Sequence, residues 1–122
     1  MARVVHFEFP ADDLERAIKF YEGVFGWGIT KWPGPVDYWL VQTGEASEAG
    51  IDGGITRRSD FMTSTVNTID VTSLDDVVEK IVAHGGQVLA PKMPVPGVGY
   101  MAYCQDTEGN IFGLMQADPT AA

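Results

Sequence analysis

The sequence is poor in cysteine, histidine and positive charge. It contains one cysteine, two histidines and eight Lys or Arg residues among 122. A single cysteine, Cys104, excludes an internal disulfide and is typical of a protein of the reducing cytoplasm. Two histidines limit the imidazole ligands available to a metal ion. Seventeen Asp and Glu residues bring the net charge to -9, which argues against binding to nucleic-acid backbones or anionic membranes.

The sequence also lacks a long apolar run. No stretch is long enough to cross a bilayer, and the first residues pass directly into an alternating pattern without the apolar core of a signal peptide. The composition, 45% hydrophobic and 20% charged, is that of a globular protein. A chain of this length fits one domain, residues 1–122, and can bury a core without disulfides. We therefore expect a cytoplasmic protein with neither a membrane nor a nucleic-acid partner.

The first half of the chain predicts a strand, a helix and three further strands. Asp12, with Glu15 three residues later, has the pattern of a helix N-cap and capping box, and Gly26 is expected to end that helix. Pro10 is expected to end the first strand, because proline cannot donate a ladder hydrogen bond. The four strands are expected at residues 3–9, 27–32, 38–43 and 51–57.

The second half repeats this order. Ser73 with Asp76 has the pattern of a second N-cap, and Gly85 is expected to close the second helix. Residues 94–99 are expected to form a loop, and Gly109 occupies a hairpin position that favours a positive φ. The four strands are expected at residues 65–71, 87–93, 100–105 and 111–116.

The two halves align with an offset of about sixty residues, a period that indicates internal duplication. Leu14 falls on Leu74 and Ile18 on Val78, so the helix positions that face a sheet keep their chemistry. We therefore predict an α+β fold of two tandem β-α-β-β-β modules, approximately residues 3–58 and 62–117. Each module would place one helix on one face of its sheet.

Three segments resemble the vicinal oxygen chelate superfamily, which includes glyoxalase I, bleomycin-resistance proteins and extradiol dioxygenases. They are the run DDLERAIKFY at residues 12–21, FGW at residues 25–27 and the hairpin DTEGN at residues 106–110. More narrowly, the chain is similar to the small glyoxalase-like proteins. The resemblance implies two modules that form a cup of open sheets around a ligand site, in a chain that pairs as a homodimer.

The resemblance also tests for a metal site. Metal-dependent members place His, Glu or Gln ligands on the first and last strands of each module, and here the matching positions are His6, Gly54, Val66 and Gly113. Only His6 carries a ligand atom, so a divalent metal is possible but disfavoured, and we expect no cofactor. A shifted site that uses Glu8 and Asp52 beside His6 has no matching pattern in the family.

Several residues are candidates for the site. His6 and Glu8 project together from one strand and could work as an acid–base pair, although a hydrogen-bonded pair that only orders the floor of the cup is the simpler interpretation. Aromatic side chains suit flat organic ligands, and glycines make room for them, but ordinary packing explains either feature as well. The candidate ligand-binding residues are Trp27, Tyr38, Trp39, Asp52, Gly54, Tyr100 and Gly113.

Three functions remain open from the sequence. The first is a metal-free protein that binds a small apolar or aromatic organic molecule and acts on it by acid–base chemistry or only holds it. The second is a metal-dependent lyase or isomerase of the lactoylglutathione lyase type. The third is a non-catalytic accessory or interaction protein. The vacant metal positions favour the first over the second, and the aromatic, glycine-lined cup favours the first over the third.

Overall fold

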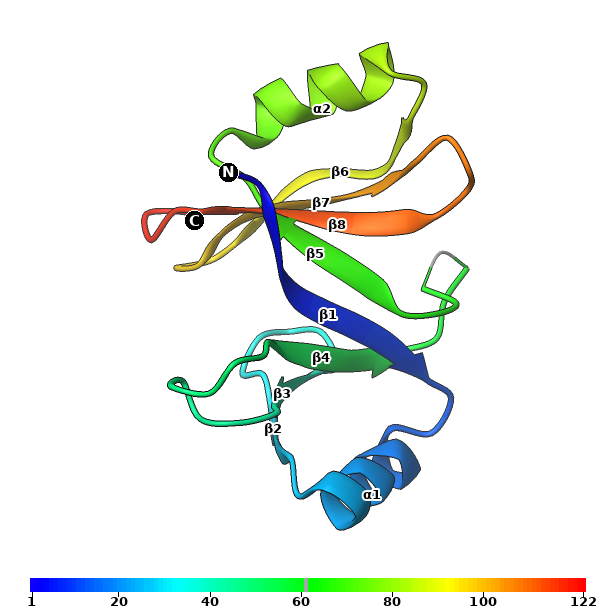
Figure 1. Cartoon of the computed structure of the whole chain (residues 1–122), viewed down its shortest axis with the longest axis vertical. Coiled ribbons are helices and arrows are strands. Elements are labelled where there is room, and N and C mark those ends of the chain that lie inside the picture. The colour runs from blue at the N-terminus through cyan, green and yellow to red at the C-terminus, as the bar shows by residue number, and fades with distance from the viewer. Residues whose placement is uncertain (61) are drawn as a thin grey trace. The chain divides into compact units, whose positions relative to one another are not determined.

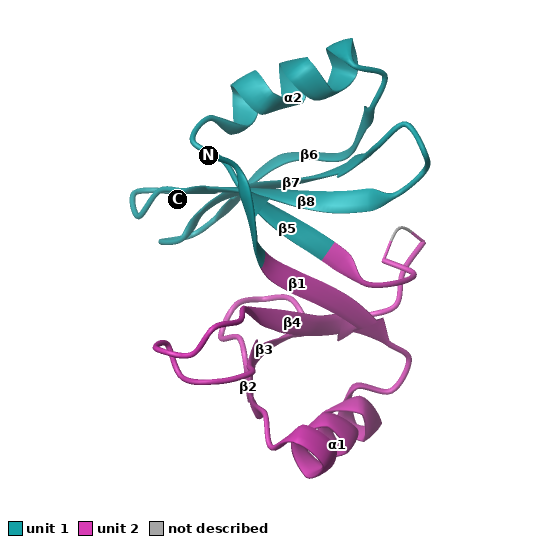
Figure 2. Ribbon diagram, in the orientation of Figure 1, with its two compact units in different colours: residues 1–5, 67–122 teal, residues 6–66 magenta. Residues whose placement is uncertain are grey.

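The structure, a computed structural model, describes residues 1–60 and 62–122, which form two compact units. Unit 1 comprises residues 1–5 and 67–122, and unit 2 comprises residues 6–66 (Figure 2). Each unit contains the element order β-α-β-β-β (Figure 1). The predicted α+β class and the predicted duplication are therefore confirmed.

The described part of unit 2 contains one helix and a four-stranded sheet with the order β2-β3-β4-β1. Strands β1 and β4 are parallel, whereas β3 is antiparallel to both β2 and β4. A parallel pair requires a long crossover, and the helix and two strands between β1 and β4 supply it. The elements are β1 (Arg3–Ala11, whose first three residues belong to unit 1), α1 (Leu14–Phe25), β2 (Gly28–Lys31), β3 (Tyr38–Gln42) and β4 (Asp52–Arg57).

The start of α1 differs from the prediction. Asp13, not Asp12, is the N-cap, and its Oδ1 accepts a hydrogen bond from the backbone N–H of Arg16 at 3.0 Å. Asp12 instead pairs with the guanidinium of Arg58, whose Nε donates to its Oδ1 at 2.8 Å. The helix end at Gly26 is confirmed, with φ 70° in the left-handed region.

The end of β1 also differs, because the strand continues through Pro10 to Ala11. Pro10 pairs in register with Thr56 of β4, and the ladder continues past it through the bond from Arg58 N–H to the Ala11 carbonyl. Proline removes only one donor, so a strand whose neighbouring residues keep their bonds can include it.

The core of unit 2 lies between α1 and one face of the sheet. Buried Leu14 of α1 packs with Ile29, Val41 and Ile55 from three strands. Phe7 and Phe9 of β1 pack against this core. Because strand side chains alternate, His6 and Glu8, which alternate with these two, lie on the opposite face.

Unit 1 has one helix and a sheet with the order β5-β8-β7-β6. Ser73 caps α2, accepting from the Asp76 N–H at 3.3 Å, as predicted. Strand β6 extends two residues into the predicted loop, to Val95, and its prolines are tolerated because β6 is an edge strand. The elements are β5 (Val66–Asp70, whose first residue belongs to unit 2), α2 (Leu74–Ala83), β6 (Gln87–Val95), β7 (Gly99–Gln105) and β8 (Ile111–Ala117).

The core of unit 1 lies between α2 and its own sheet, and it includes fully buried Leu74, Leu114 and Cys104. The hairpin that joins β7 to β8 is ordered by Asp106, which accepts from the backbone N–H groups of Glu108 and Asn110 at 2.8 and 2.9 Å. These bonds stabilise the carboxylate and lower the pKa of Asp106. Gly109 has φ 84°, as its hairpin position predicts. Neither helix is long and apolar enough to cross a membrane, among the residues described.

Candidate functional site

The face of unit 2 opposite α1 carries the polar residues that the sequence singled out. In the parallel pair β1–β4, His6 lies opposite Asp52 and Glu8 lies opposite Gly54. Leu40 of β3 is the other neighbour of Gly54. The strand register therefore gathers one imidazole and two carboxyl groups around a position without a side chain.

One polar contact of this face joins His6 to Tyr38. Nε2 of the imidazole lies 2.7 Å from the phenol oxygen of Tyr38, a short hydrogen bond whose direction depends on the tautomer of His6. The phenol reaches this point because it lies over Gly54: a Cβ at position 54 would overlap both its hydroxyl and its ring. The sequence identified Tyr38 and Gly54 as ligand-binding candidates but not their dependence on each other.

Burial sets the charge state of His6. Desolvation lowers the pKa of this imidazole below its ordinary value of 6.5, and the carboxyl groups of Glu8 and Asp52 oppose the shift only in part. A neutral imidazole is therefore favoured at neutral pH. Its Nε2 accepts a hydrogen bond from the Tyr38 hydroxyl in one tautomer and donates one to the phenol oxygen in the other.

Asp52 is held in place by Thr43, a residue that sequence reasoning missed. Its Oδ1 accepts from the Thr43 backbone N–H at 2.9 Å and from the Thr43 hydroxyl at 3.3 Å. The same hydroxyl donates to the Ile51 carbonyl at 2.7 Å. The sequence does hold a signal for this contact. If the predicted strands 38–43 and 51–57 pair antiparallel, the end of the first, at Thr43, lies beside the start of the second, at Asp52. Glu8, the other carboxylate, is only 4% exposed.

Of the remaining predicted site residues, two lie on the other face of unit 2 and two belong to unit 1. Trp27 and Trp39 pack on the opposite side of the sheet, with the core that α1 covers. In unit 1, Tyr100 packs against the core under α2, and Lys92 Nζ lies 4.7 Å from the centre of its ring. Gly113 is on the face of unit 1 opposite α2, where a Cβ would stand 3.3 Å from the Thr68 hydroxyl oxygen. A role for these four residues in binding a ligand stays a prediction.

The residues of this face do not fit a divalent metal ion. The Nε2 atom of His6 is engaged by Tyr38, and Oδ1 of Asp52 is engaged by Thr43. A divalent ion needs three or four converging ligands. Among residues 1–60 and 62–122, no three His, Cys, Asp or Glu side chains are grouped so that they could hold one.

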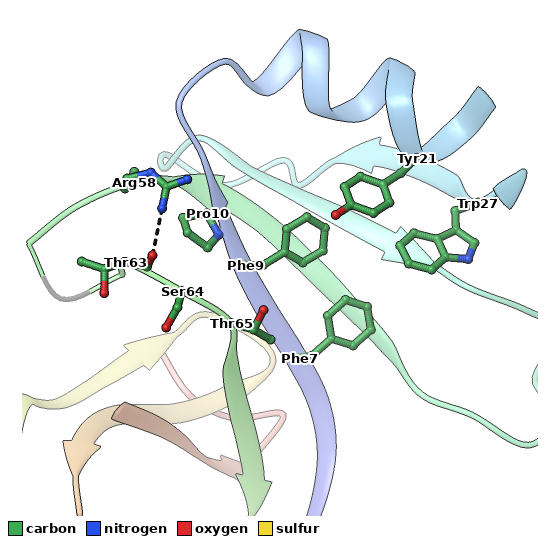
Figure 3. A pocket seen from close by; sticks show the side chains of 9 residues that line it. All are labelled: Phe7, Phe9, Pro10, Tyr21, Trp27, Arg58, Thr63, Ser64 and Thr65. Carbon is green, nitrogen blue, oxygen red and sulfur yellow. Dashed lines mark hydrogen bonds between the residues drawn. The ribbon is translucent and has the colours of Figure 1, made fainter. Parts of the chain in front are cut away.

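A separate groove of about 460 Å³ lies on the α1 side of unit 2 (Figure 3). Phe9 and Tyr21 form part of its aromatic wall, with ring centres 5.0 Å apart, and Tyr21 stacks on Trp27 at 5.2 Å. Arg58, which also lines the groove, is held by the protein itself, since its Nη1 donates to the Thr63 carbonyl at 2.8 Å and its Nε to Asp12. We therefore assign the groove to packing of α1 and place the candidate site at His6 and Tyr38.

The fold and the His6 face define a protein of glyoxalase-like architecture, and comparison with known proteins supports this class. Residues 3–44 match the family model described as bleomycin resistance protein-like N-terminal. A glyoxylase-like domain-containing protein of Didymella fabae is 31% identical over 115 residues, covering 88% of each chain. The chain belongs to the vicinal oxygen chelate superfamily of glyoxalase and bleomycin-resistance proteins.

Two further relatives show how the chain compares in length and in fold. The putative glyoxylase CFP32 of Mycobacterium tuberculosis is 34% identical over 115 residues, which cover 91% of this chain and 44% of that protein. The chain thus spans less than half the length of this curated relative. Methylmalonyl-CoA epimerase of Streptomyces coelicolor superposes with a TM-score of 0.71 over 98% of this chain and 97% of that one. Its 16% identity shows a shared fold alone.

Proposed function

We propose that this protein binds a small, largely apolar or aromatic organic molecule at the His6 face of unit 2, without a metal ion. The observation that carries the proposal is the hydrogen bond between His6 Nε2 and Tyr38. This hydrogen bond engages Nε2, the imidazole nitrogen that would coordinate a metal. It also holds an imidazole and a phenol, two groups that can exchange protons, next to each other. A neutral imidazole beside a phenol can hold or move a proton of a bound molecule.

The surroundings of this pair suit a small apolar ligand. Gly54 contributes no side chain, and Leu40 beside it is 41% exposed. Apolar surface with a few convergent polar groups is the usual composition of small-molecule sites. Glu8 and Asp52 lie on the same face as His6, so we also assign them to the site, with His6 and Glu8 as the candidate acid–base residues.

Thermal denaturation in the presence of a library of aromatic and apolar fragments tests the proposal. A molecule that binds only the folded state must raise the melting temperature by mass action. We expect hits in the wild type that are lost or weakened in His6→Ala and in Tyr38→Phe. Hits that bind both variants unchanged would place the ligand elsewhere, and a complete lack of hits would favour the alternative of an accessory protein without a small ligand.

The second candidate function is a metal-dependent lyase or isomerase. This function is supported by the activities for which similar proteins are named. One of them is lactoylglutathione lyase GLX1 of Arabidopsis thaliana, which is 28% identical over 135 residues that cover 45% of that protein. Metal analysis of the purified protein after incubation with nickel, zinc, manganese or iron separates the two functions. We expect no stoichiometric metal, and one metal per chain that is lost in His6→Ala would overturn the metal-free proposal.

We also propose that the protein forms a homodimer. Helix α1 exposes three large apolar side chains, Phe20, Val24 and Phe25, each by more than half. A contiguous exposed apolar patch is typical of an interaction surface. The match to this chain covers 44% of CFP32, so a single CFP32 chain is long enough to contain two segments of this size, as a homodimer of this protein would. Light scattering should give twice the 13.2 kDa mass, and Val24→Glu should yield the monomer; a monomeric wild type would contradict the proposal.

A cytoplasmic location is the last part of the proposal. The cysteine, Cys104, is unpaired and fully buried, which suits a reducing compartment. Fractionation of the source cells with an antibody to the protein tests it, and recovery of the protein outside the cytoplasm would contradict it.

A further inference from the structure

The tryptophan that directly follows β2 lies on the same face as Tyr38. The backbone N–H of Trp32 donates to the Tyr38 carbonyl at 2.8 Å. This bond continues the antiparallel register of β2 and β3, in which Lys31 lies opposite Trp39. Trp32 is therefore opposite Tyr38, and the side chains of directly opposed residues project from the same face of a sheet. Because the Tyr38 phenol reaches His6 on that face, Trp32 lies beside the candidate site.

Two contacts hold the indole of Trp32 in place. Its ring centre is 6.3 Å from that of Tyr38 and the two planes meet at 82°, the edge-to-face arrangement that aromatic pairs favour. The second contact is made by Gly34, where a Cβ would overlap the six-membered ring of the indole. The indole is thus oriented by a phenol and by backbone, and it remains only half-buried.

The short connection between β2 and β3, which carries the indole, is anchored where it ends at Asp37. The Asp37 carboxylate accepts from Arg57 Nε at 3.1 Å, and its backbone carbonyl accepts from the Thr56 hydroxyl at 3.4 Å. Pro33 and Pro35 restrict φ at two positions of the connection. A ring on such a restricted segment loses little conformational freedom when it contacts a ligand.

Trp32 differs in this placement from the other two tryptophans of the chain. Trp27 and Trp39 pack with the core that α1 covers, on the opposite side of the sheet. On the His6 face, Tyr38 is followed two residues later by Leu40, which is 41% exposed. This face therefore carries an indole and an aliphatic side chain beside its hydrogen-bonded pair.

We propose that Trp32 is a ligand-binding residue of the His6 face, and that the ligand carries a planar aromatic ring that packs against the indole. This inference rests on the proposed function, and it narrows the ligand from apolar or aromatic molecules to aromatic ones. Contacts between aromatic rings stabilise a complex beyond the apolar area that they bury. A saturated ring of the same size buries a similar area but lacks this contribution.

Two alcohols that differ only in the saturation of their rings test the inference: 2-naphthylmethanol and decahydro-2-naphthylmethanol. Calorimetry measures their dissociation constants. We expect the wild type to bind the aromatic alcohol about three- to tenfold more tightly than the saturated one. Trp32→Leu, which keeps an apolar side chain, should abolish this preference, and Trp32→Phe should retain part of it.

Two further variants test the position of the indole and the specificity of the effect. Gly34→Ala keeps Trp32 but displaces its ring, so the preference for the aromatic alcohol should fall. Phe20→Leu is the matched control, since it removes an aromatic ring from an exposed position on α1. Its preference should remain as in the wild type.

Nuclear magnetic resonance locates the bound ring in the wild-type protein. The three tryptophans give three indole N–H cross-peaks, and Trp32→Phe identifies the one that belongs to Trp32. Saturation with 2-naphthylmethanol should shift this cross-peak through the ring current of the probe. The cross-peaks of Trp27 and Trp39, on the other side of the sheet, should shift less.

The outcomes distinguish this inference from the proposed function. If both alcohols bind the wild type equally, if Trp32→Leu keeps the preference, if Phe20→Leu loses it, or if the Trp32 cross-peak stays in place, the assigned role of Trp32 is wrong. Binding that still weakens in Tyr38→Phe would in that case leave the proposed site intact. If neither alcohol binds, or if binding ignores both Tyr38→Phe and His6→Ala, the proposed function fails and this inference fails with it.

Discussion

The phenol of Tyr38 lies in the space that a side chain at position 54 would fill, and Gly54 is what allows it to reach His6. The two positions are neighbours in space although they are sixteen positions apart in the chain. The hydrogen-bonded pair at the candidate site thus depends on the absence of one Cβ atom.

Gly54→Ala should displace the phenol and disrupt its bond to His6. We expect a loss of about 1–3 kcal/mol in the free energy of unfolding, the usual cost of overpacking, together with loss of fragment binding. Urea denaturation and the thermal-shift screen measure the two effects. Gly23→Ala is the control: nothing lies within 4 Å of its Cβ position inside α1, so stability should rise, by about 0.5–1 kcal/mol. A Gly54→Ala variant that is as stable and binds as well as the wild type would show that Tyr38 needs no such space.

The stability of the protein should fall as the pH drops from 7.5 to 5. The folded-state pKa of His6 lies below its ordinary value of 6.5, so the unfolded chain binds a proton first. The stability that neutral His6 contributes is fully present at pH values above its ordinary pKa and is lost as the pH falls through the folded-state pKa. Urea denaturation at several pH values should show this slope, and His6→Gln should reduce it.

Asp106 and Asp118 do not contribute to the change in stability between pH 7.5 and 5. Hydrogen bonds lower the pKa of each carboxyl group below its ordinary value of 3.8, so their contributions are lost only in more acidic solution. An NMR titration of the His6 ring gives a direct check, and a midpoint above 6.5 would contradict the desolvation argument.

Asp12 and Asp13 should differ in their effect on α1. Asp13→Ala removes the N-cap acceptor and should cost about 1 kcal/mol of stability. Asp12→Ala removes an exposed ion pair with Arg58 and should cost less, about 0.2–1 kcal/mol. Urea denaturation of the two variants measures the difference in the free energy of unfolding. A larger loss for Asp12→Ala would show that Asp12, as the sequence pattern predicted, is the N-cap.

Cys104 should be unreactive in the folded protein. It is fully buried, and desolvation raises the pKa of its thiol, so little thiolate is present. A colourimetric thiol reagent should react slowly with the native protein and rapidly in denaturant. Fast reaction in both conditions would show that β7 opens readily.

Local patterns in the chain were sufficient to predict most of the fold. Apolar periodicity, the Ser73 cap and the glycines at helix and hairpin ends act over a few residues, and they placed two helices and eight strands in a repeated order. Alternation also separated His6 and Glu8 from the apolar face of β1. The errors fell at boundaries, where Asp12 and Asp13 are equally good caps and only the contact with Arg58 distinguishes them.

The sequence by itself determined the duplicated α+β architecture, the family and the face that holds His6, because each follows from periodicity or from contiguous motifs. The tertiary structure alone decided which candidates meet there. In the folded chain Tyr38 hydrogen-bonds to His6 and Thr43 to Asp52. Trp27 and Trp39 instead pack against the core beneath α1. Strand register is a long-range property, and a contact set by register between distant segments has no signature in either segment alone.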